Sequence, residues 1–482
     1  MRGPQNRIFE SLTRSVTPAI RSANDSTEQR RLTVRRIFAG GVPSFDARRK
    51  VNRLLPSWPP QWTPAGLFLT AGLFRAAQNS GQTTFPLLAR NDIGASAGTI
   101  GALGTTAGVV MVLAASVLAT KLATRRATSV IAAGSAILAV GLFVIGSTVS
   151  LIQLTAGLVF LGIAGGIAPS SLATAIGGAG RVQRERQLAI YATVLSASLA
   201  IGPVLEAATL YVAHQDVRIA LFAFAPLPVL ALAVGLRTGH KGTPGPNHLS
   251  VNEKPSPPVG PTAPAPAAQA KLELPSDTAK SQEPKEKRPG RTVLLGTPAG
   301  RIALIMQLLY TVPFAMVTVF GALLARNVFG LTAAHSQLGF TALFVTSLAS
   351  RVAVVRRSPI EAKLPLFAAC VALTIAGLTL LALGGQPVVF YVAMALLGVP
   401  HGVIFPLALS LVASSARDGQ LAAANAGLFA TVSLVSAMAP AILGSIASAF
   451  DYRIMAAAVI APVLIFTMLL LAQWRRMTAL HT

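Results

Sequence analysis

The chain has 482 residues, of which 53% are hydrophobic and 12% are charged. This composition is too apolar for a soluble enzyme and is typical of a protein that crosses a membrane many times. The formal net charge of +24 does not indicate nucleic-acid binding, because the basic residues are spread over short loops and two tails. The single cysteine, Cys370, excludes an intrachain disulfide, and the sequence has no His and Cys pattern typical of a metal site.

Residues 1–61 form a basic tail with twelve Arg or Lys residues and four acidic residues. The tail has no long apolar core, so it is not a secretory signal. Its spacing allows an amphipathic helix on anionic lipid, and its composition equally allows a disordered, solvated tail.

Twelve apolar segments are long enough to cross a bilayer. The first six are expected at 62–88, 99–120, 128–148, 150–176, 188–212 and 217–236. The last six are expected at 301–325, 331–350, 362–384, 387–413, 421–447 and 453–474. Between them, residues 238–299 are rich in Pro, Lys, Glu, Ser and Ala, which predicts an extended, disordered linker. We therefore predict an all-α polytopic membrane protein of twelve transmembrane helices, with six-helix pseudo-repeats at 62–237 and 300–476 and a short tail at 477–482.

The basic residues of the loops predict the orientation of the helices in the membrane. Thirteen lie on the side of the N-terminal tail: Lys121, Arg125, Arg126, Arg181, Arg184, Arg186, Arg351, Arg356, Arg357, Lys363, Arg417, Arg475 and Arg476. Four lie in the opposite loops: Arg90, Arg218, Arg326 and Arg453. Because cytoplasmic loops carry the excess of positive charge, both termini and the linker are predicted to be cytoplasmic, in the cell (inner) membrane.

A polar stripe runs along the first apolar segment. Arg75, Gln78, Asn79 and Gln82 follow i, i+3, i+4 and i+7 and therefore share one face of a helix. Such a face cannot point at lipid, so it is predicted to line a solute pathway and bind the substrate. The alternative is that Arg75 is a structural charge paired within the bundle.

The seventh segment carries a second polar face. Gln307, Tyr310 and Thr311, followed by Phe314 and Thr318, have helical spacing and are predicted to complete the same cavity. The alternative is that the Thr and Tyr hydroxyls bond to nearby backbone groups. Asn425 and Tyr191 are further candidates for the cavity wall.

Two residues are candidates for proton coupling. Glu206 is the acidic residue placed well inside a spanning segment, where low dielectric favours the neutral carboxyl. It is either a proton carrier or a structural partner of Arg75. His401, between Pro400 and Gly402, is the second candidate, because histidine titrates near neutral pH, although a neutral packing histidine is also consistent with its position.

The two halves of the sequence resemble each other at an offset of 236 residues. Leu88-Ala89-Arg90-Asn91 recurs as Leu324-Ala325-Arg326-Asn327, and Leu161-Gly162-Ile163 recurs as Leu397-Gly398-Val399. Parallel six-helix repeats joined by a linker place a binding site between the halves, near the middle of the membrane. With this organisation, residues 62–476 resemble the major facilitator superfamily.

Two motifs carry this resemblance further. The family's loop between helices two and three reads G-x-x-x-D-R-x-G-R-R, and here residues 116–125 keep its position and basic character without its Gly and Asp residues. The resemblance implies that Lys121, Arg125 and Arg126 belong to a gating loop. Residues 202–207 (Gly-Pro-Val-Leu-Glu-Ala) are similar to the G-P-x-x-G-G element of antiporters, with Glu206 and Ala207 in place of the glycine pair. The helix-four Arg of proton-coupled exporters is replaced here by Leu158.

No catalytic constellation and no phosphate-binding loop is found, so the chain is predicted not to be an enzyme and to need no cofactor or metal. The resemblance implies a monomeric secondary transporter that moves a small organic solute by alternating access, with proton-linked efflux favoured by helix five. One alternative is uptake or exchange of an anionic metabolite bound by Arg75. Another is a membrane sensor that does not transport and whose tail or linker binds a cytoplasmic partner.

Overall fold

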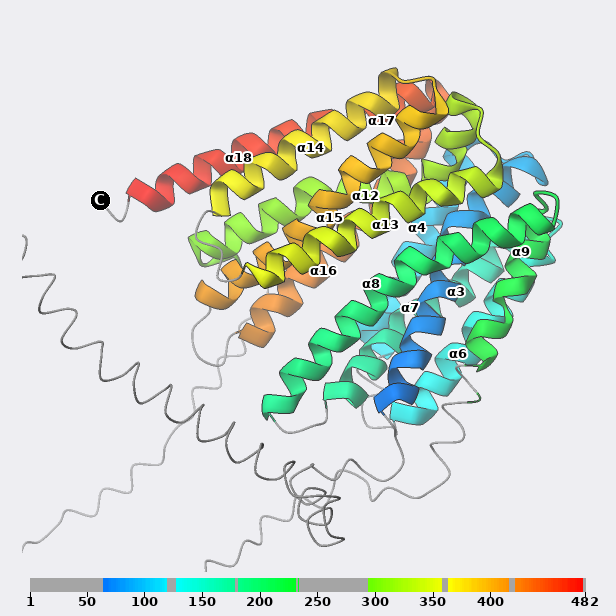
Figure 1. The fold of residues 1–482 in the computed structure, drawn as a ribbon, viewed down its shortest axis with the longest axis horizontal. Helices are drawn as coiled ribbons and strands as arrows, with labels where there is room; N and C mark the ends of the chain where they lie inside the picture. Colours follow the sequence, from blue (N-terminus) through cyan, green and yellow to red (C-terminus); the bar gives the residue numbers. More distant parts are fainter. Residues whose placement is uncertain are drawn as a thin grey trace, which may run out of the picture. The chain divides into compact units, whose positions relative to one another are not determined.

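The computed structural model describes residues 64–118, 127–177, 181–230, 233, 294–357, 363–415 and 421–479. Within these ranges every regular element is a helix, which confirms the predicted all-α fold (Figure 1). The basic tail at 1–61, most of the predicted linker at 238–299, and the predicted gating residues Lys121, Arg125 and Arg126 lie outside the described residues.

The helices form two groups along the chain, coloured blue to green and green to red in Figure 1. The first group consists of α3 (Pro64–Asn91), α4 (Ala97–Leu113) with a π-helical end η1 (Ala114–Leu118), α6 (Ala127–Gly146), α7 (Leu151–Gly177), α8 (Arg181–Val212) and α9 (Val217–Phe224). The second group consists of α12 (Pro298–Phe329), α13 (Ala333–Arg356), α14 (Lys363–Leu383), α15 (Pro387–Ser415), α16 (Leu421–Ala449), α17 (Tyr452–Ala458) and α18 (Ile460–Ala479).

Ten helices of the described residues are long and apolar enough to cross a membrane. The predicted first segment, now α3, is not among them, because its polar stripe interrupts the apolar sequence. The predicted sixth segment is described as a shorter apolar helix, Val217–Leu230. The predicted twelfth segment is divided into α17 and α18, which together form one candidate span.

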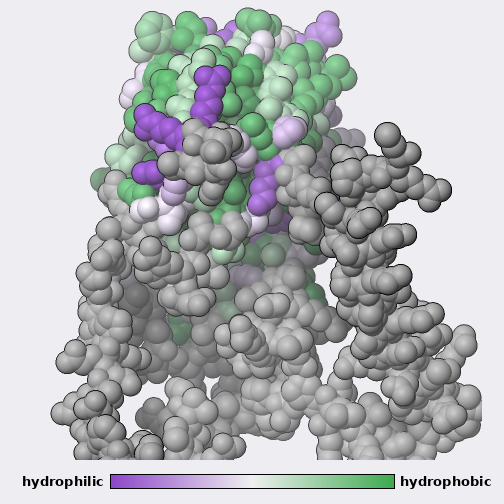
Figure 2. Space-filling model, turned by 90° about the vertical axis from the view of Figure 1, so that its left-hand side faces the viewer, coloured by the Kyte–Doolittle hydropathy of each residue, from purple (hydrophilic) through white to green (hydrophobic). Residues whose placement is uncertain are grey.

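Large apolar side chains cover the outside of the helices. Ile152, Tyr211 and Met468 are 84%, 76% and 69% exposed. Figure 2 shows hydrophobic residues over most of the described part of one face, with hydrophilic residues in a few places. An apolar exterior of this kind is stable in lipid rather than in water, which agrees with the spanning helices.

One end of the bundle carries capped helix starts, and we call it the capped end: residues 92–96, 147–150, 213–216, 330–332, 384–386 and 450–451. Here Ser96, Asp216, Thr332 and Asp451 accept hydrogen bonds from amides in the first turns of α4, α9, α13 and α17. These side chains satisfy donors that a helix start leaves without partners, which explains why the helices begin there.

The two groups of helices meet at the capped end. Along α4 and α16, Gly98 N donates a 2.6 Å hydrogen bond to Ser448 Oγ. A Cβ atom on Gly101 would overlap the carbonyl oxygen of Pro440, so only glycine allows this approach. Because glycine lacks a side chain, the two backbones can touch where lipid gives no hydrophobic drive for association.

A second contact between the groups joins α8 to α13. Gln215 follows α8 in a left-handed turn with φ of 70°, and its Oε1 accepts a 2.9 Å hydrogen bond from Ala334 N. Ala334 lies in the first turn of α13, so the first group supplies a partner for the start of a helix in the second group. At this end, the halves are therefore held together by polar contacts as well as by packing.

Candidate functional site

A cavity of about 720 Å³ lies between the two groups of helices. Its wall is formed by α3, α4, α7 and α8 from the first group and by α12, α13, α15 and α16 from the second. These are the first, second, fourth and fifth helices of each group. The symmetry of the wall follows from the sequence repeat and places the site between the halves.

Arg75 on α3 lines this cavity. Its Nη1 donates a 3.1 Å hydrogen bond to Gln78 Oε1, and Tyr191 on α8 lines the same cavity. Gln78 is itself 1% exposed and packs against α4 through Met111. Gln78 therefore positions the guanidinium rather than facing the cavity.

The other two residues of the predicted stripe differ in their positions. Gln82 lines the cavity, as predicted for a substrate-binding residue. Asn79 is 3% exposed, lies outside the cavity wall, and has no partner for its Nδ2 within the described residues. Two of the four predicted residues thus reach the cavity.

A second cavity arginine was assigned to a loop by the sequence, and this assignment is wrong. α13 extends to Arg356, six residues beyond the predicted end of that segment, so Arg351 lies inside the helix and lines the cavity. Its Nη1 donates a 2.7 Å hydrogen bond to Ser196 Oγ on α8, while its Nε is buried without a partner. The i, i+4 spacing of Ser347 and Arg351 was the signal that could have placed it on a polar helix face.

Neither cavity arginine has an acidic partner in the part of the chain that the structure describes. The ion pair found there joins Arg218 and Asp92, 2.6 Å apart, near the capped end. The predicted alternative of an Arg75–Glu206 pair is not observed, since Arg75 bonds to Gln78 and Glu206 bonds elsewhere. The cavity therefore holds two positive charges whose described neighbours are neutral.

His401 on α15 lines the cavity and belongs to an aromatic cluster. Arg75 and Arg351 line the same cavity as this imidazole. The ring stacks on Phe314, with centroids 4.4 Å apart and planes inclined by 22°, and its Nδ1 lies 2.7 Å from Ser347 Oγ. Because Ser347 and Phe314 fix the ring, the imidazole and Phe314 present a flat wall to the cavity.

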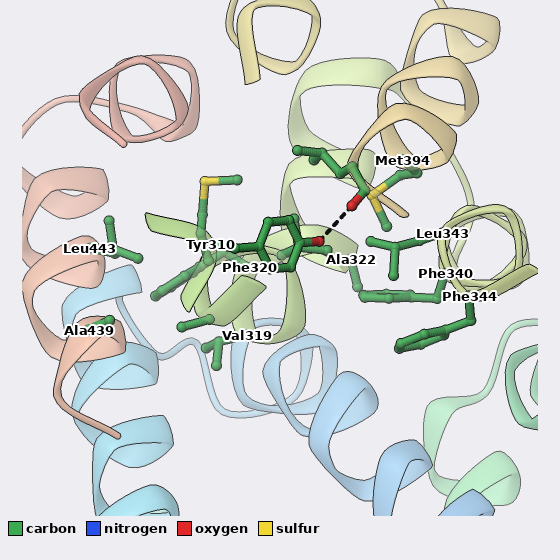
Figure 3. Close-up of a cluster of buried hydrophobic side chains, with 14 of the residues drawn as sticks. Tyr310, Val319, Phe320, Ala322, Phe340, Leu343, Phe344, Met394, Ala439 and Leu443 are labelled. Atoms are coloured by element: carbon green, nitrogen blue, oxygen red, sulfur yellow. Dashed lines mark hydrogen bonds between the residues drawn. The ribbon is translucent and has the colours of Figure 1, made fainter. Parts of the chain in front are cut away.

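The polar groups of α12 are largely engaged by the protein. The Tyr310 hydroxyl donates a 2.6 Å hydrogen bond to Leu397 O on α15, within a cluster of buried side chains (Figure 3). Thr311 Oγ1 donates to Gln307 O, one turn earlier. These bonds follow the alternative in which hydroxyls satisfy backbone groups, although Gln307, Tyr310 and Thr311 all line the cavity. Asn425 lies outside its wall.

Glu206 on α8 also lies outside the cavity wall and is fully buried. Its Oε1 accepts hydrogen bonds from Thr84 Oγ1 on α3 and, at 3.2 Å, from Gln337 Nε2 on α13. The two candidates for proton coupling therefore occupy separate places, with His401 at the cavity and Glu206 between helices of the two groups.

The chain is similar in fold to solved transporters. It has a TM-score of 0.63 and 12% identity to the nucleoside transporter NupG, covering 85% of this chain and 98% of that one. For a bacterial homologue of the human lysosomal transporter Spinster, inward-facing and occupied, the TM-score is 0.64 at 12% identity, with 86% and 98% covered. For the human organic anion transporter MFSD10 (TETRAN) it is 0.56 at 17% identity, with 86% and 100% covered.

A comparison with curated proteins gives no match. The sequence profile described as Major Facilitator Superfamily matches residues 67–419, from the first turn of α3 to the end of the predicted loop after α15. This range includes nearly all of the first group of helices and α12 to α15 of the second, and therefore every helix of the cavity wall except α16. Both the sequence match and the arrangement of the helices agree with this family. The chain therefore belongs to the major facilitator superfamily.

Proposed function

We propose that this protein is a secondary transporter that moves a small organic anion across the membrane by alternating access. The observation that carries the proposal is the presence of Arg75 and Arg351 in one cavity, without an acidic partner among the described residues. A guanidinium group is costly to keep in a low-dielectric site unless an anion accompanies it. A substrate carboxylate or phosphate would provide that charge and accept the two-pronged hydrogen bonds that arginine donates.

The contacts between the halves support an orientation for this state. The α4–α16 and α8–α13 contacts close the capped end. If the excess of basic loops marks the cytoplasmic side, the capped end faces outward. We infer that the structure represents a state closed to the outside, from which rocking of the two halves would expose the cavity to the opposite side.

Proton-linked efflux, which the helix-five motif favours, remains a prediction about direction and coupling. The buried Glu206 supports a role for protons, and its position outside the cavity wall separates the proton site from the anion site. In this scheme the substrate neutralises the arginines while proton binding acts on the contact between the halves.

Counterflow in proteoliposomes tests the proposal. Purified protein would be assayed with a panel of anionic, neutral and cationic solutes, comparing wild type with Arg75→Gln and Arg351→Gln. We expect the wild type to exchange one or more anions, Arg75→Gln to lose this exchange, and Arg351→Gln to reduce it about 10- to 100-fold. Exchange limited to neutral or cationic solutes, or unaffected by both substitutions, would contradict the anion proposal, and absence of any exchange by folded protein would favour the sensor alternative.

A further inference from the structure

The side chains around Glu206 form a contact between the two halves that differs from the apolar packing around it. Glu206 belongs to α8 and Thr84 to α3, both in the first group, whereas Gln337 belongs to α13 in the second. All three side chains are fully buried. Gln337 Nε2 lies 3.2 Å from Glu206 Oε1 and 3.4 Å from Thr84 Oγ1, so the amide of one half holds the carboxyl and the hydroxyl of the other.

The atoms of this cluster that have no partner are informative. Glu206 Oε1 accepts two hydrogen bonds, but Glu206 Oε2 and Gln337 Oε1 are buried with none. In an ionised carboxylate both of these oxygens are acceptors, and two buried acceptors cannot satisfy each other. Adding one proton to Oε2 makes it a donor, which supplies the missing hydrogen bond.

We propose that Glu206, Thr84 and Gln337 form a proton-binding lock that holds the capped end closed. In the locked state Glu206 carries a proton on Oε2, which it shares with Gln337 Oε1, while Gln337 Nε2 donates to Glu206 Oε1. A carboxylic acid and a carboxamide have complementary donor and acceptor edges, so one proton joins the halves through a pair of hydrogen bonds. The proton comes from water and the step makes or breaks no other covalent bond.

The lock links proton binding to conformation. When the capped end opens, α13 separates from α8 and α3, water reaches Glu206, and the carboxyl can release its proton. The ionised carboxylate then resists reburial, because closing would remove its hydration and leave it facing an amide oxygen. Low pH therefore favours the closed capped end, and raising the pH favours the open one.

No charged side chain of the described residues takes part in the lock. On α3, Arg75 bonds to Gln78 and Arg90 donates to Ala95 O. On α13, the His335 ring contacts the Thr332 hydroxyl, and Arg351 donates a hydrogen bond to Ser196. On α9, Arg218 pairs with Asp92, and the described side chains of α7 and of the rest of α8 carry no charge. Ser80 on α3 is also near Glu206 and is neutral, and its Oγ makes no hydrogen bond to the carboxyl group. The charge state of Glu206 is therefore the one that changes within this contact.

Distance measurements across the capped end test the lock without a substrate. Spin labels would be attached at Val149→Cys and Gln386→Cys, which lie in turns of the first and second groups, with the buried Cys370 replaced by alanine. Label distances in lipid nanodiscs would be recorded by pulsed electron paramagnetic resonance between about pH 5 and about pH 9. We expect short distances at low pH and a shift to longer distances as the pH rises.

Three variants identify the group responsible. Glu206→Gln keeps the paired hydrogen bonds without a titratable proton, so the short distances should persist and the shift with pH should be lost. Gln337→Leu removes the partner in the other half, so long distances should appear already at low pH. Asp92→Asn is the matched control, an acid-to-amide change at the capped end within one half, and should keep the wild-type shift.

The proposal would be overturned by an unchanged pH response in Glu206→Gln or by the absence of any pH response in the wild type. Short distances at low pH in Gln337→Leu would exclude Gln337 as the partner. The role of the lock in transport rests on the proposed function. The distances between the spin labels, however, are measured without an anion and do not depend on it. If substitutions at Arg75 or Arg351 did not affect transport, the anion proposal would fail, but the distance test of the lock would remain valid.

Discussion

Arg351 on α13 donates a 2.7 Å hydrogen bond from Nη1 to Ser196 Oγ on α8, and through this bond the second half of the fold contacts the first at the cavity wall. The Nε of the same guanidinium is buried without a partner. One donor of this guanidinium is therefore left unsatisfied by the described residues. Its contact with Ser196 links the site to the relative position of the halves.

Substitution of Arg351 should affect transport more strongly than substitution of its partner. A hydrogen bond to a charged group is worth about 1.5–3 kcal/mol, so Arg351→Gln should lower kcat/KM for anions about 10- to 100-fold. Ser196→Ala leaves the charge of Arg351 in place and should lower kcat/KM for anions by less than about tenfold. Initial rates of anion uptake in proteoliposomes measure both, and equal losses would contradict a direct role for the guanidinium.

Anion exchange by variants at Arg75 should depend on both the charge and the shape of the side chain at this position. Arg75→Gln removes the charge and is expected to abolish measurable anion exchange, while Arg75→Lys keeps the charge without the planar fork and should retain part of it. Gln78→Leu removes the hydrogen bond that orients Arg75 and is expected to raise KM more than it lowers kcat. Counterflow titrated with substrate separates these effects, and a Lys variant as inactive as the Gln variant would indicate that charge alone is insufficient.

The stacked pair of Phe314 and His401 should favour substrates with a flat group. An aromatic contact adds about 0.5–1.5 kcal/mol beyond apolar burial, so Phe314→Leu should raise KM for anions that carry a ring by up to about tenfold. Aliphatic anions serve as the control, because leucine preserves most of the apolar surface. Equal changes for both kinds of anion would argue against stacking.

The close approach of α4 and α16 should be sensitive to a single side chain. At Gly101 a Cβ atom would overlap the carbonyl oxygen of Pro440, so Gly101→Val should prevent full closure of the capped end and lengthen the distance between labels at Val149→Cys and Gln386→Cys. Gly202→Ala is the matched control, because its Cβ would meet Ala76 at 3.6 Å, an ordinary contact. If Gly101→Val keeps the short distance, the glycine contact does not limit closure.

The sequence predicted most of the helices and a cavity between the halves, because lipid imposes long apolar segments and the repeat offset places equivalent helices around one centre. Arg75, Gln82 and His401 could be identified from the sequence as candidate site residues. An ionisable or amide group inside an apolar segment is too costly to face lipid and must point into the bundle. Arg351 was assigned to a loop because the end of a spanning helix is uncertain by several residues, and its i, i+4 spacing from Ser347 was the sequence signal for a position on the helix. The partners of Glu206 could not be predicted from the sequence either. Thr84 and Gln337 are 253 residues apart, and their proximity depends on how the two halves pack together.

The turn that joins α8 to α9 provides a natural reporter of these motions. Gln215 of one half accepts the amide hydrogen of Ala334, which belongs to the first turn of α13 in the other half. When the capped end opens, this amide must exchange its protein acceptor for water and lose its protection from solvent deuterium. Deuterium uptake at the start of α13, followed by mass spectrometry on the native sequence, would therefore follow the transport cycle without any introduced label.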